Sequence, residues 1–290
     1  MIPQESADTA KRVQKPRLVL MGEFSAGKST LTNIILDSQP LPMRVTATRL
    51  PPVEIRYGPP AAHAIGFDGV PTPLALDSLE TVLLDDTAKI EVFMEAEVLQ
   101  LCDLLDMPGI SDPNMPRETW ENVIEERDHV IWCTHATQAW RQSEAAIWNI
   151  LRAHASAHNI LLITQFDKLQ NNRDRMRVRK RVESETRGQF EAIFPVSLLQ
   201  ALEAADTPSA WTGSGVSAFT DHIANLLTRN GAFDRHVSTQ DASQNPASAS
   251  LAADAPAQTG ARVLPRRVAT GTTAAAREGG ALRAASPATG

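Results

Sequence analysis

Short apolar runs alternate with longer stretches of helical periodicity between residues 16 and 228. The apolar runs predict strands at residues 17–21, 52–57, 89–94, 98–105, 129–134, 160–165 and 192–196. The periodic stretches predict helices at residues 28–37, 76–84, 117–126, 143–157, 172–190 and 214–228. Strands that alternate with helices in this way are typical of an α/β fold, in which a mostly parallel sheet carries helices on both faces.

This pattern stops near Gly231. From there to Gly290 the chain consists mainly of Ala, Ser, Thr, Pro and Gly, with no apolar periodicity to offset the entropy of an ordered chain. We therefore expect a flexible segment at 1–15, a folded domain at 16–230 and a disordered Ala/Ser/Pro-rich C-terminal tail at 231–290. The tail could recruit a separate protein partner, or it could be an unselective solubilising extension.

Composition narrows the class of protein. Apolar residues make up 42% of the chain and charged residues 21%, as in soluble globular proteins, and the net charge is −6. A negative net charge argues against a nucleic-acid partner. Cys102 and Cys133 both lie in apolar runs, which predicts neither a disulfide framework nor a zinc site. Because no apolar stretch reaches the ~18 residues of a membrane span and the N-terminus has no apolar signal region, we expect a cytoplasmic protein.

The strongest motif is GEFSAGKS, which fits the phosphate-loop pattern G-x-x-x-x-G-K-[ST] between a predicted strand and a predicted helix. Backbone N–H groups of such a loop surround phosphates, and the following helix adds its positive N-terminal end. Lys28 is expected to reach the β- and γ-phosphates and the Ser29 hydroxyl to bind Mg²⁺. The expected nucleotide-binding residues of this segment are Gly22, Glu23, Phe24, Ser25, Ala26, Gly27, Lys28, Ser29 and Thr30.

A second motif, D-x-x-G, follows the apolar run LCDLL at Asp106 and Gly109. Asp106 can hold Mg²⁺ through a water, and the Gly109 N–H can sense the γ-phosphate, as in a switch loop that GTP orders. Such a motif alone is weak evidence. Its place about eighty residues after a phosphate loop makes it a candidate second nucleotide contact.

The base-reading segment is expected at TQFD, where Thr164, Gln165 and Asp167 follow a predicted buried strand. A carboxylate at Asp167 accepts the guanine N1–H and N2–H groups, for which adenine offers no matching donors. An ordinary N-capping aspartate is the alternative interpretation. After the next predicted strand, a backbone N–H at Val196 or Ser197 is expected to meet the guanine carbonyl.

Together these residues resemble the GTPase domain of the dynamin superfamily, especially its bacterial dynamin-like members. GEFSAGKSTLTNIIL resembles their phosphate loop and first helix, LPMRVTATRLPPVEIRYG their first switch, LLDMPG their second switch, and TQFD with FPVSLLQAL their base-reading loops. The resemblance covers about residues 16–228 and implies a P-loop GTPase fold. It implies binding of GTP and GDP, hydrolysis of GTP with Mg²⁺, and activation by homodimerisation of the G domain or by a partner.

The resemblance also implies catalytic residues. Thr48 matches the switch threonine that addresses Mg²⁺ and the catalytic water, with Thr46 as a competitor in the same segment. The Ser25 backbone, Lys28 and Gly109 complete the implied catalytic set.

The chain departs from the family pattern at three points. Phe24 and Ile110 stand where related GTPases carry a glutamine that orients water, so we expect a low intrinsic rate. The alternative to a slow GTP hydrolase is a guanine-nucleotide switch or scaffold module that does not hydrolyse GTP. Gln165 replaces the usual lysine. Only 15 residues precede Pro16 and a disordered tail is predicted at the other end, so we expect no long helical stalk and at most peripheral membrane contact.

Trp140 lies in the region where dynamin-like G domains meet each other. Its ring could contribute to such an interface or could fold onto its own domain.

Overall fold

The structure of the chain is a computed structural model that describes residues 15–36, 50–76, 79, 82, 86–111, 123–203 and 207–242, with side chains up to Arg229. All of them lie within Met1–Gln258, the first of two compact units of the chain. The helices predicted at 76–84 and 117–126 fall mostly outside the described residues, as does the part of the predicted tail 231–290 that follows residue 242. The proposed domain boundaries therefore stay predictions.

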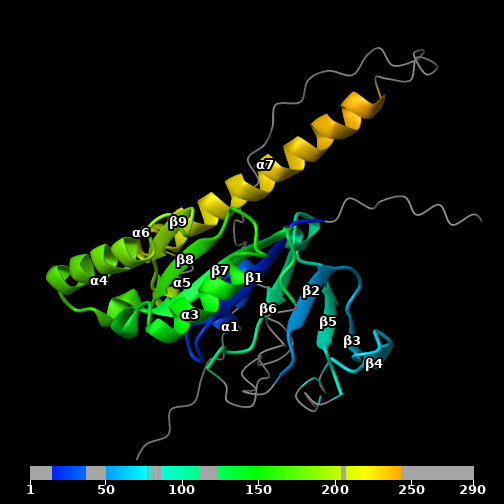
Figure 1. Ribbon diagram of the computed structural model, residues 1–290, viewed down its shortest axis with the longest axis horizontal. Coiled ribbons are helices and arrows are strands. Elements are labelled where there is room, and N and C mark those ends of the chain that lie inside the picture. Colours follow the sequence, from blue (N-terminus) through cyan, green and yellow to red (C-terminus); the bar gives the residue numbers. More distant parts are fainter. Residues whose placement is uncertain are drawn as a thin grey trace, which may run out of the picture. The chain divides into compact units, whose positions relative to one another are not determined.

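Nine strands of the described residues form one sheet, in the order β4-β3-β5-β2-β6-β1-β7-β8-β9 (Figure 1). The strands are β1 (Arg17–Gly22), β2 (Val53–Tyr57), β3 (Ala61–Ile65), β4 (Pro71–Leu74), β5 (Lys89–Met94), β6 (Asp103–Asp106), β7 (Asp128–His135), β8 (Ile160–Thr164) and β9 (Ala192–Pro195). The run β6-β1-β7-β8-β9 is parallel throughout, and β2 is parallel to β5. The β2–β6, β3–β4 and β3–β5 pairs are antiparallel. The prediction of a mostly parallel sheet is confirmed.

Helices cover both faces of this sheet (Figure 1). The α-helices are α1 (Lys28–Ile35), α3 (Gln142–Leu151), α4 (Asn172–Glu185), α5 (Leu198–Glu203), α6 (Pro208–Gly213) and α7 (Val216–Ala242). Because successive strand residues point to opposite faces, Leu18 and Leu20 of β1 pack with α1, α5 and α7. Val19 and Met21 pack with α3 and α4 on the other face. This division explains why all six residues of β1 are buried or nearly so.

Several predicted boundaries were wrong. The run 98–105 is not one strand: Glu97–Gln100 form a short 3₁₀ helix, with Leu99 buried, and pairing to β1 begins only at Asp103. Strands β3 and β4 were not predicted because prolines and small residues mask their pattern. Both prolines of β4 lie on a strand at the edge of the sheet, where a missing N–H is tolerated.

The helices also differ from the prediction in length. α3 ends at Leu151 and α4 at Glu185, earlier than expected, and α5 and α6 were not predicted. α7 continues to Ala242, past the expected start of the tail at residue 231. A glycine such as Gly231 costs a helix ~1 kcal/mol relative to alanine and does not have to end it. Among the described residues no helix is both long enough and apolar enough to cross a membrane.

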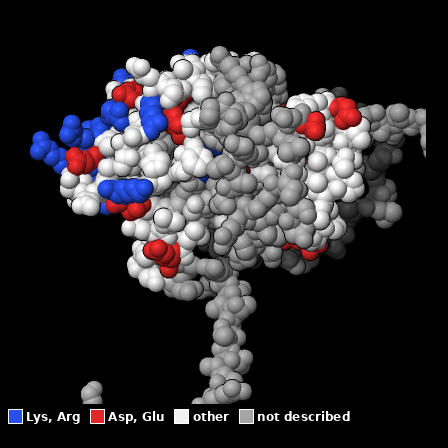
Figure 2. All heavy atoms as spheres, turned by 90° about the horizontal axis from the view of Figure 1, so that it is seen from below, with Lys and Arg blue, Asp and Glu red and all other residues white. Residues whose placement is uncertain are grey.

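Basic side chains gather over α4 (Figure 2). Part of this charge is engaged within the domain. Arg179 pairs with Glu183 at 2.7 Å, and Arg181 donates to the Ala139 carbonyl oxygen at 2.6 Å. The latter bond fastens α4 to the segment that precedes α3.

Candidate functional site

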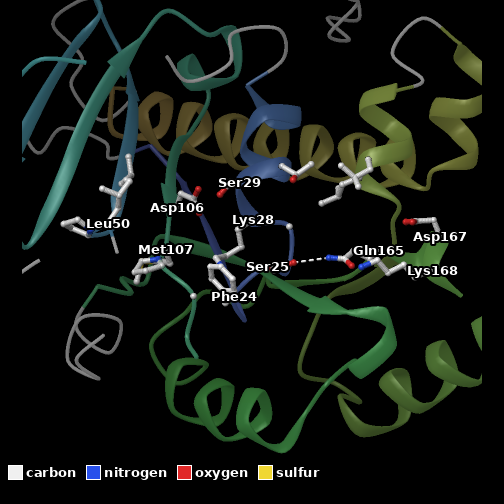
Figure 3. Close-up of a pocket in the computed structure, with 18 residues that line it drawn as sticks. Phe24, Ser25, Lys28, Ser29, Leu50, Asp106, Met107, Gln165, Asp167 and Lys168 are labelled. Carbon is white, nitrogen blue, oxygen red and sulfur yellow. Dashed lines mark hydrogen bonds between the residues drawn. The ribbon is translucent and has the colours of Figure 1, made fainter. Parts of the chain in front are cut away.

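A pocket of about 440 Å³ lies at the carboxyl ends of β1, β6 and β8, where a doubly wound sheet usually binds its ligand (Figure 3). It gathers residues from all three predicted motifs. The predicted residues that line it are Phe24, Ser25, Gly27, Lys28, Ser29, Thr30, Asp106, Gly109, Gln165 and Asp167. In Figure 3, Leu50 and Met107 lie at one end of the pocket and Asp167 and Lys168 at the other, with the phosphate loop between them.

The phosphate loop runs from Gly22, the last residue of β1, to Lys28, the first residue of α1. Its path depends on backbone conformations that glycine tolerates best. Gly22 has φ 141° and Gly27 has φ 90°. A Cβ atom on Gly22 would lie 2.1 Å from the Cys133 carbonyl oxygen of the neighbouring strand, so only glycine fits there.

Lys28 is buried at the floor of this loop. Its Nζ donates to the carbonyl oxygens of Gly22 at 3.0 Å and of Glu23 at 2.9 Å. Burial lowers the Lys28 pKa, against the opposing effect of the nearby Asp106 carboxylate. The loop thus holds an ammonium group at the place where a bound phosphate would need a cation.

Asp106 and Ser29 lie beside Lys28 and offer oxygen atoms to the pocket (Figure 3). Burial raises the Asp106 pKa to about 6, although the Lys28 charge and a 3.1 Å hydrogen bond from the Thr32 hydroxyl both lower it. A carboxylate and a hydroxyl are hard ligands of the kind Mg²⁺ prefers. The described residues contain no group of three or more His, Cys, Asp or Glu that could hold a metal ion by themselves. This donor set suits Mg²⁺ that arrives with a nucleotide, because its phosphates supply further ligands.

The segment after β6 contacts the phosphate loop directly. The Ile110 N–H donates to the Gly22 carbonyl oxygen at 3.2 Å, and the Phe24 N–H donates to Ser111 Oγ at 3.2 Å. The Phe24 side chain itself is 57% exposed at the pocket. The pocket therefore presents a phenyl ring, which has no polar group to orient a water molecule.

Gln165 joins the base-reading segment to the phosphate loop. It has φ 52°, and its side-chain Nε2 donates to the Ser25 carbonyl oxygen at 3.0 Å, the dashed line in Figure 3. Asp167 follows in a 3₁₀ turn, Phe166–Lys168, and is half-buried at the same end of the pocket. The base-reading segment and the phosphate loop are thus in direct contact.

Other predicted residues do not line the pocket. The Val196 N–H donates to the Ile163 carbonyl oxygen and the Ser197 N–H to the Ser214 carbonyl oxygen, both at 2.9 Å. Leu198 and Leu199, at the start of α5, line the pocket instead. Four other predicted residues do not line the pocket either: Gly22, Glu23, Ala26 and Thr164. Thr48 and its competitor Thr46 lie outside the described residues.

The prediction missed the apolar wall. Leu50, Pro51 and Val53 line the side of the pocket near β2, and Lys168 lines the opposite end. Leu50, Pro51 and Val53 belong to the segment that resembles the first switch, and Lys168 follows Asp167 directly. Nothing in the residue pattern singled them out as pocket residues, because apolar side chains of a wall carry no fixed spacing.

Trp140 is buried, with 5% of its surface exposed. Its ring contacts those of Trp132 and Phe190 edge to face, at centroid distances of 6.0 and 5.5 Å. The interpretation that the Trp140 ring folds onto its own domain is confirmed. The interpretation that Trp140 is an exposed interface residue was wrong.

Known proteins resemble this chain in sequence and in fold. A sequence model of the Dynamin family matches residues 18–188. Dynamin-like protein 2 of Campylobacter jejuni subsp. jejuni serotype O:23/36 (strain 81-176) is 23% identical over 158 residues, and the match covers 52% of this chain and 26% of that protein. Two solved chains of an oligomerised bacterial dynamin pair superpose with TM-scores of 0.52 and 0.51, at 18% and 20% identity.

Each superposition covers 74% of this chain and 34% of the bacterial dynamin, so the chain spans about a third of those proteins. At this identity the superpositions show the fold, which is that of P-loop GTPases. The family model matches more than half of the chain. The chain therefore belongs to the dynamin family, and the matched part is a dynamin-family GTPase domain.

Proposed function

We propose that this protein binds GTP with Mg²⁺ and hydrolyses it to GDP and phosphate. The observation that supports this most is the convergence in one pocket of a phosphate loop, a buried carboxylate at Asp106 and a base-reading segment at Asp167. Dynamin-family GTPases are in general GTP hydrolases, which supports the same reaction here.

The residues around the phosphate site have separate roles in the proposed reaction. Lys28 neutralises the β- and γ-phosphates, and the Gly109 N–H donates a hydrogen bond to the γ-phosphate. The Ser29 hydroxyl would hold Mg²⁺ directly, and Asp106 through a water, with Thr48 as the third residue of the set. The ion would neutralise charge that develops on the phosphate oxygens.

The choice of base rests on Asp167. Its carboxylate accepts from guanine N1–H and N2–H, and a base without these donors leaves it unpaired. Gln165 supports this recognition by tying the base-reading segment to Ser25 of the loop. The neutral side-chain amide of Gln165 thus connects the base-reading segment with the phosphate loop.

Hydrolysis needs help from a second molecule in this proposal. Phe24 and Ile110 cannot orient water, so an isolated domain should turn over GTP at rates on the order of 10⁻⁴ to 10⁻³ s⁻¹. Two apolar side chains, Phe24 and Leu199, are 57% and 58% exposed at the pocket rim. We propose that a second G domain covers them and excludes water, which fixes the Ser25 backbone and Thr48 around the transferred phosphoryl group.

The same Phe24 and Ile110 favour one alternative, a guanine-nucleotide switch or scaffold that does not hydrolyse GTP.

We propose a cytoplasmic protein with peripheral membrane contact at most, and a tail beyond residue 231 that recruits a separate partner.

One experiment separates the hydrolase from the non-hydrolysing switch: turnover of GTP and ATP by the purified chain, measured against protein concentration. Tight GTP binding without turnover at any concentration would establish the switch, and equal binding of ATP would remove the GTPase proposal.

A further inference from the structure

Glu23 belongs to the phosphate loop but does not line the pocket. Its side chain, 13% exposed, faces the start of α3 instead. Its carboxylate oxygen Oε1 accepts from the Ser143 hydroxyl at 3.1 Å, and Oε2 lies 3.7 Å from Arg141 Nη1. The Glu23 carbonyl oxygen also accepts from Lys28 Nζ at 2.9 Å. One residue thus contacts both the phosphate lysine and a segment 120 residues away.

The segment that meets Glu23, residues 139–143, is fastened by a buried carboxylate. Glu144 is 1% exposed and accepts three hydrogen bonds, from Trp132 Nε1 at 3.0 Å, the Thr134 hydroxyl at 2.9 Å and the Arg141 N–H at 2.9 Å. The Thr134 oxygen in turn accepts from the Trp140 N–H at 2.8 Å. A carboxylate buried this completely keeps its place only because donors surround it.

The backbone of this segment has a conformation that it would not adopt alone. Trp140 has φ 56°, which is rare for a bulky residue. The rings of Trp132 and Phe190 enclose its side chain, and Arg181 of α4 donates to the Ala139 carbonyl oxygen. Such a conformation persists only where the surroundings over-determine it, and it is often found at functional sites.

We infer that Glu23 is a positioning residue, through which segment 139–143 holds the phosphate loop and Lys28 in the geometry that receives the β- and γ-phosphates. This inference rests on the proposed guanine-nucleotide site and adds a function for residues outside it. Arg141 and Ser143 act on phosphate only through Glu23 and Lys28. Loss of the contact should therefore weaken binding of nucleotides that carry a β-phosphate and leave GMP binding unaffected.

The test is a double-mutant cycle on the full chain. Glu23→Ala, the pair Arg141→Ala with Ser143→Ala, and the triple variant are compared with the wild type by competition of GDP and GMP against a fluorescent GDP analogue. We expect GDP affinity to fall about tenfold in Glu23→Ala and in the pair, and no further in the triple variant, because both changes remove one contact. GMP affinity should stay within about twofold.

A matched control removes an ion pair elsewhere. Arg179 and Glu183 form a 2.7 Å pair on α4, and Arg179→Ala with Glu183→Ala should change neither GDP nor GMP affinity. The inference is overturned if GDP and GMP affinities fall equally, if the losses add in the triple variant, or if folded variants bind GDP normally. A wild type that binds no guanine nucleotide would instead overturn the proposed function.

Discussion

A methyl group on Gly109 would lie 2.9 Å from the backbone nitrogen of Phe24, so the segment after β6 touches the phosphate loop with no room for a side chain between them. Phe24 and Gly109 come from the two motifs that are expected to meet the γ-phosphate. Their backbones form a single surface, and a change in one segment is transmitted to the other by contact.

Gly109→Ala tests this contact. The added methyl group does not fit unless one of the two backbones shifts, and such a shift should displace the Gly109 N–H from the γ-phosphate. We expect GTP turnover to fall at least about tenfold, while GDP affinity stays within about twofold. Single-turnover kinetics with GDP titrations measure both, and unchanged turnover would contradict the assigned role of Gly109.

Lys28→Ala and Ser29→Asn test the phosphate site itself. The first removes the buried cation at the loop floor, and the second replaces the hydroxyl expected at Mg²⁺. Phosphate release should fall to background in both variants, with native circular dichroism. Turnover that survives Lys28→Ala would place the activity elsewhere or in a contaminant.

Asp167→Asn tests the choice of base. An amide at this position can donate to the 2-oxo group of xanthine, whereas the carboxylate accepts from the 2-amino group of guanine. We expect the preference to change from GTP to XTP, read out by competition against a labelled nucleotide. If wild-type protein binds ATP as well as GTP, Asp167 does not read the base.

Self-activation predicts that turnover per molecule rises with protein concentration over about a hundredfold range. Leu199→Ser should blunt the rise even at saturating GTP, because Leu199 is 58% exposed at the pocket rim. Phe67→Ser is the control, since Phe67 is 74% exposed in the β3–β4 turn and lines no part of the pocket. A flat dependence, with no GTP-dependent dimer in sedimentation, would argue for a foreign activator instead.

His129 predicts a pH dependence of stability. Burial lowers its pKa to about 4, helped by the His158 charge and opposed by Glu191, and Ser156 Oγ lies 2.7 Å from its Nδ1. The unfolded chain takes up this proton near pH 6.5, so the contribution to stability is complete above pH 6.5 and is lost as the pH falls towards 4. Urea unfolding at pH 7 and 4.5 should show that the wild type loses about 2 to 3 kcal/mol more than His129→Gln. Equal losses of unfolding free energy in the wild type and in His129→Gln would contradict the lowered pKa of His129.

The sequence predicted the part of the site that local patterns encode. Gly27 and Lys28 are recognisable because only certain residues allow the loop conformation and supply the cation. Leu50 and Leu199 could not be found in this way, since any apolar residue at the right place in space can form a wall.

Tertiary structure decided the remaining features. Glu23 looked like one more phosphate contact because its partners Arg141 and Ser143 are far away in sequence. Trp140 was ambiguous for the same reason, as its burial depends on Phe190 from a different segment. The continuation of α7 to Ala242 likewise exceeds what residue preferences indicate around Gly231.

The aromatic cluster behind segment 139–143 provides an optical signal. Three of the five tryptophans, Trp132, Trp140 and Trp148, lie in edge-to-face contact on one side of the sheet. Tryptophan emission depends on the polarity and quenching groups around each indole, and Trp140 is the neighbour of the arginine that faces Glu23. Intrinsic fluorescence of the unlabelled protein should therefore follow movements of the phosphate loop in real time, with Trp140→Phe as the variant that assigns the change to one ring.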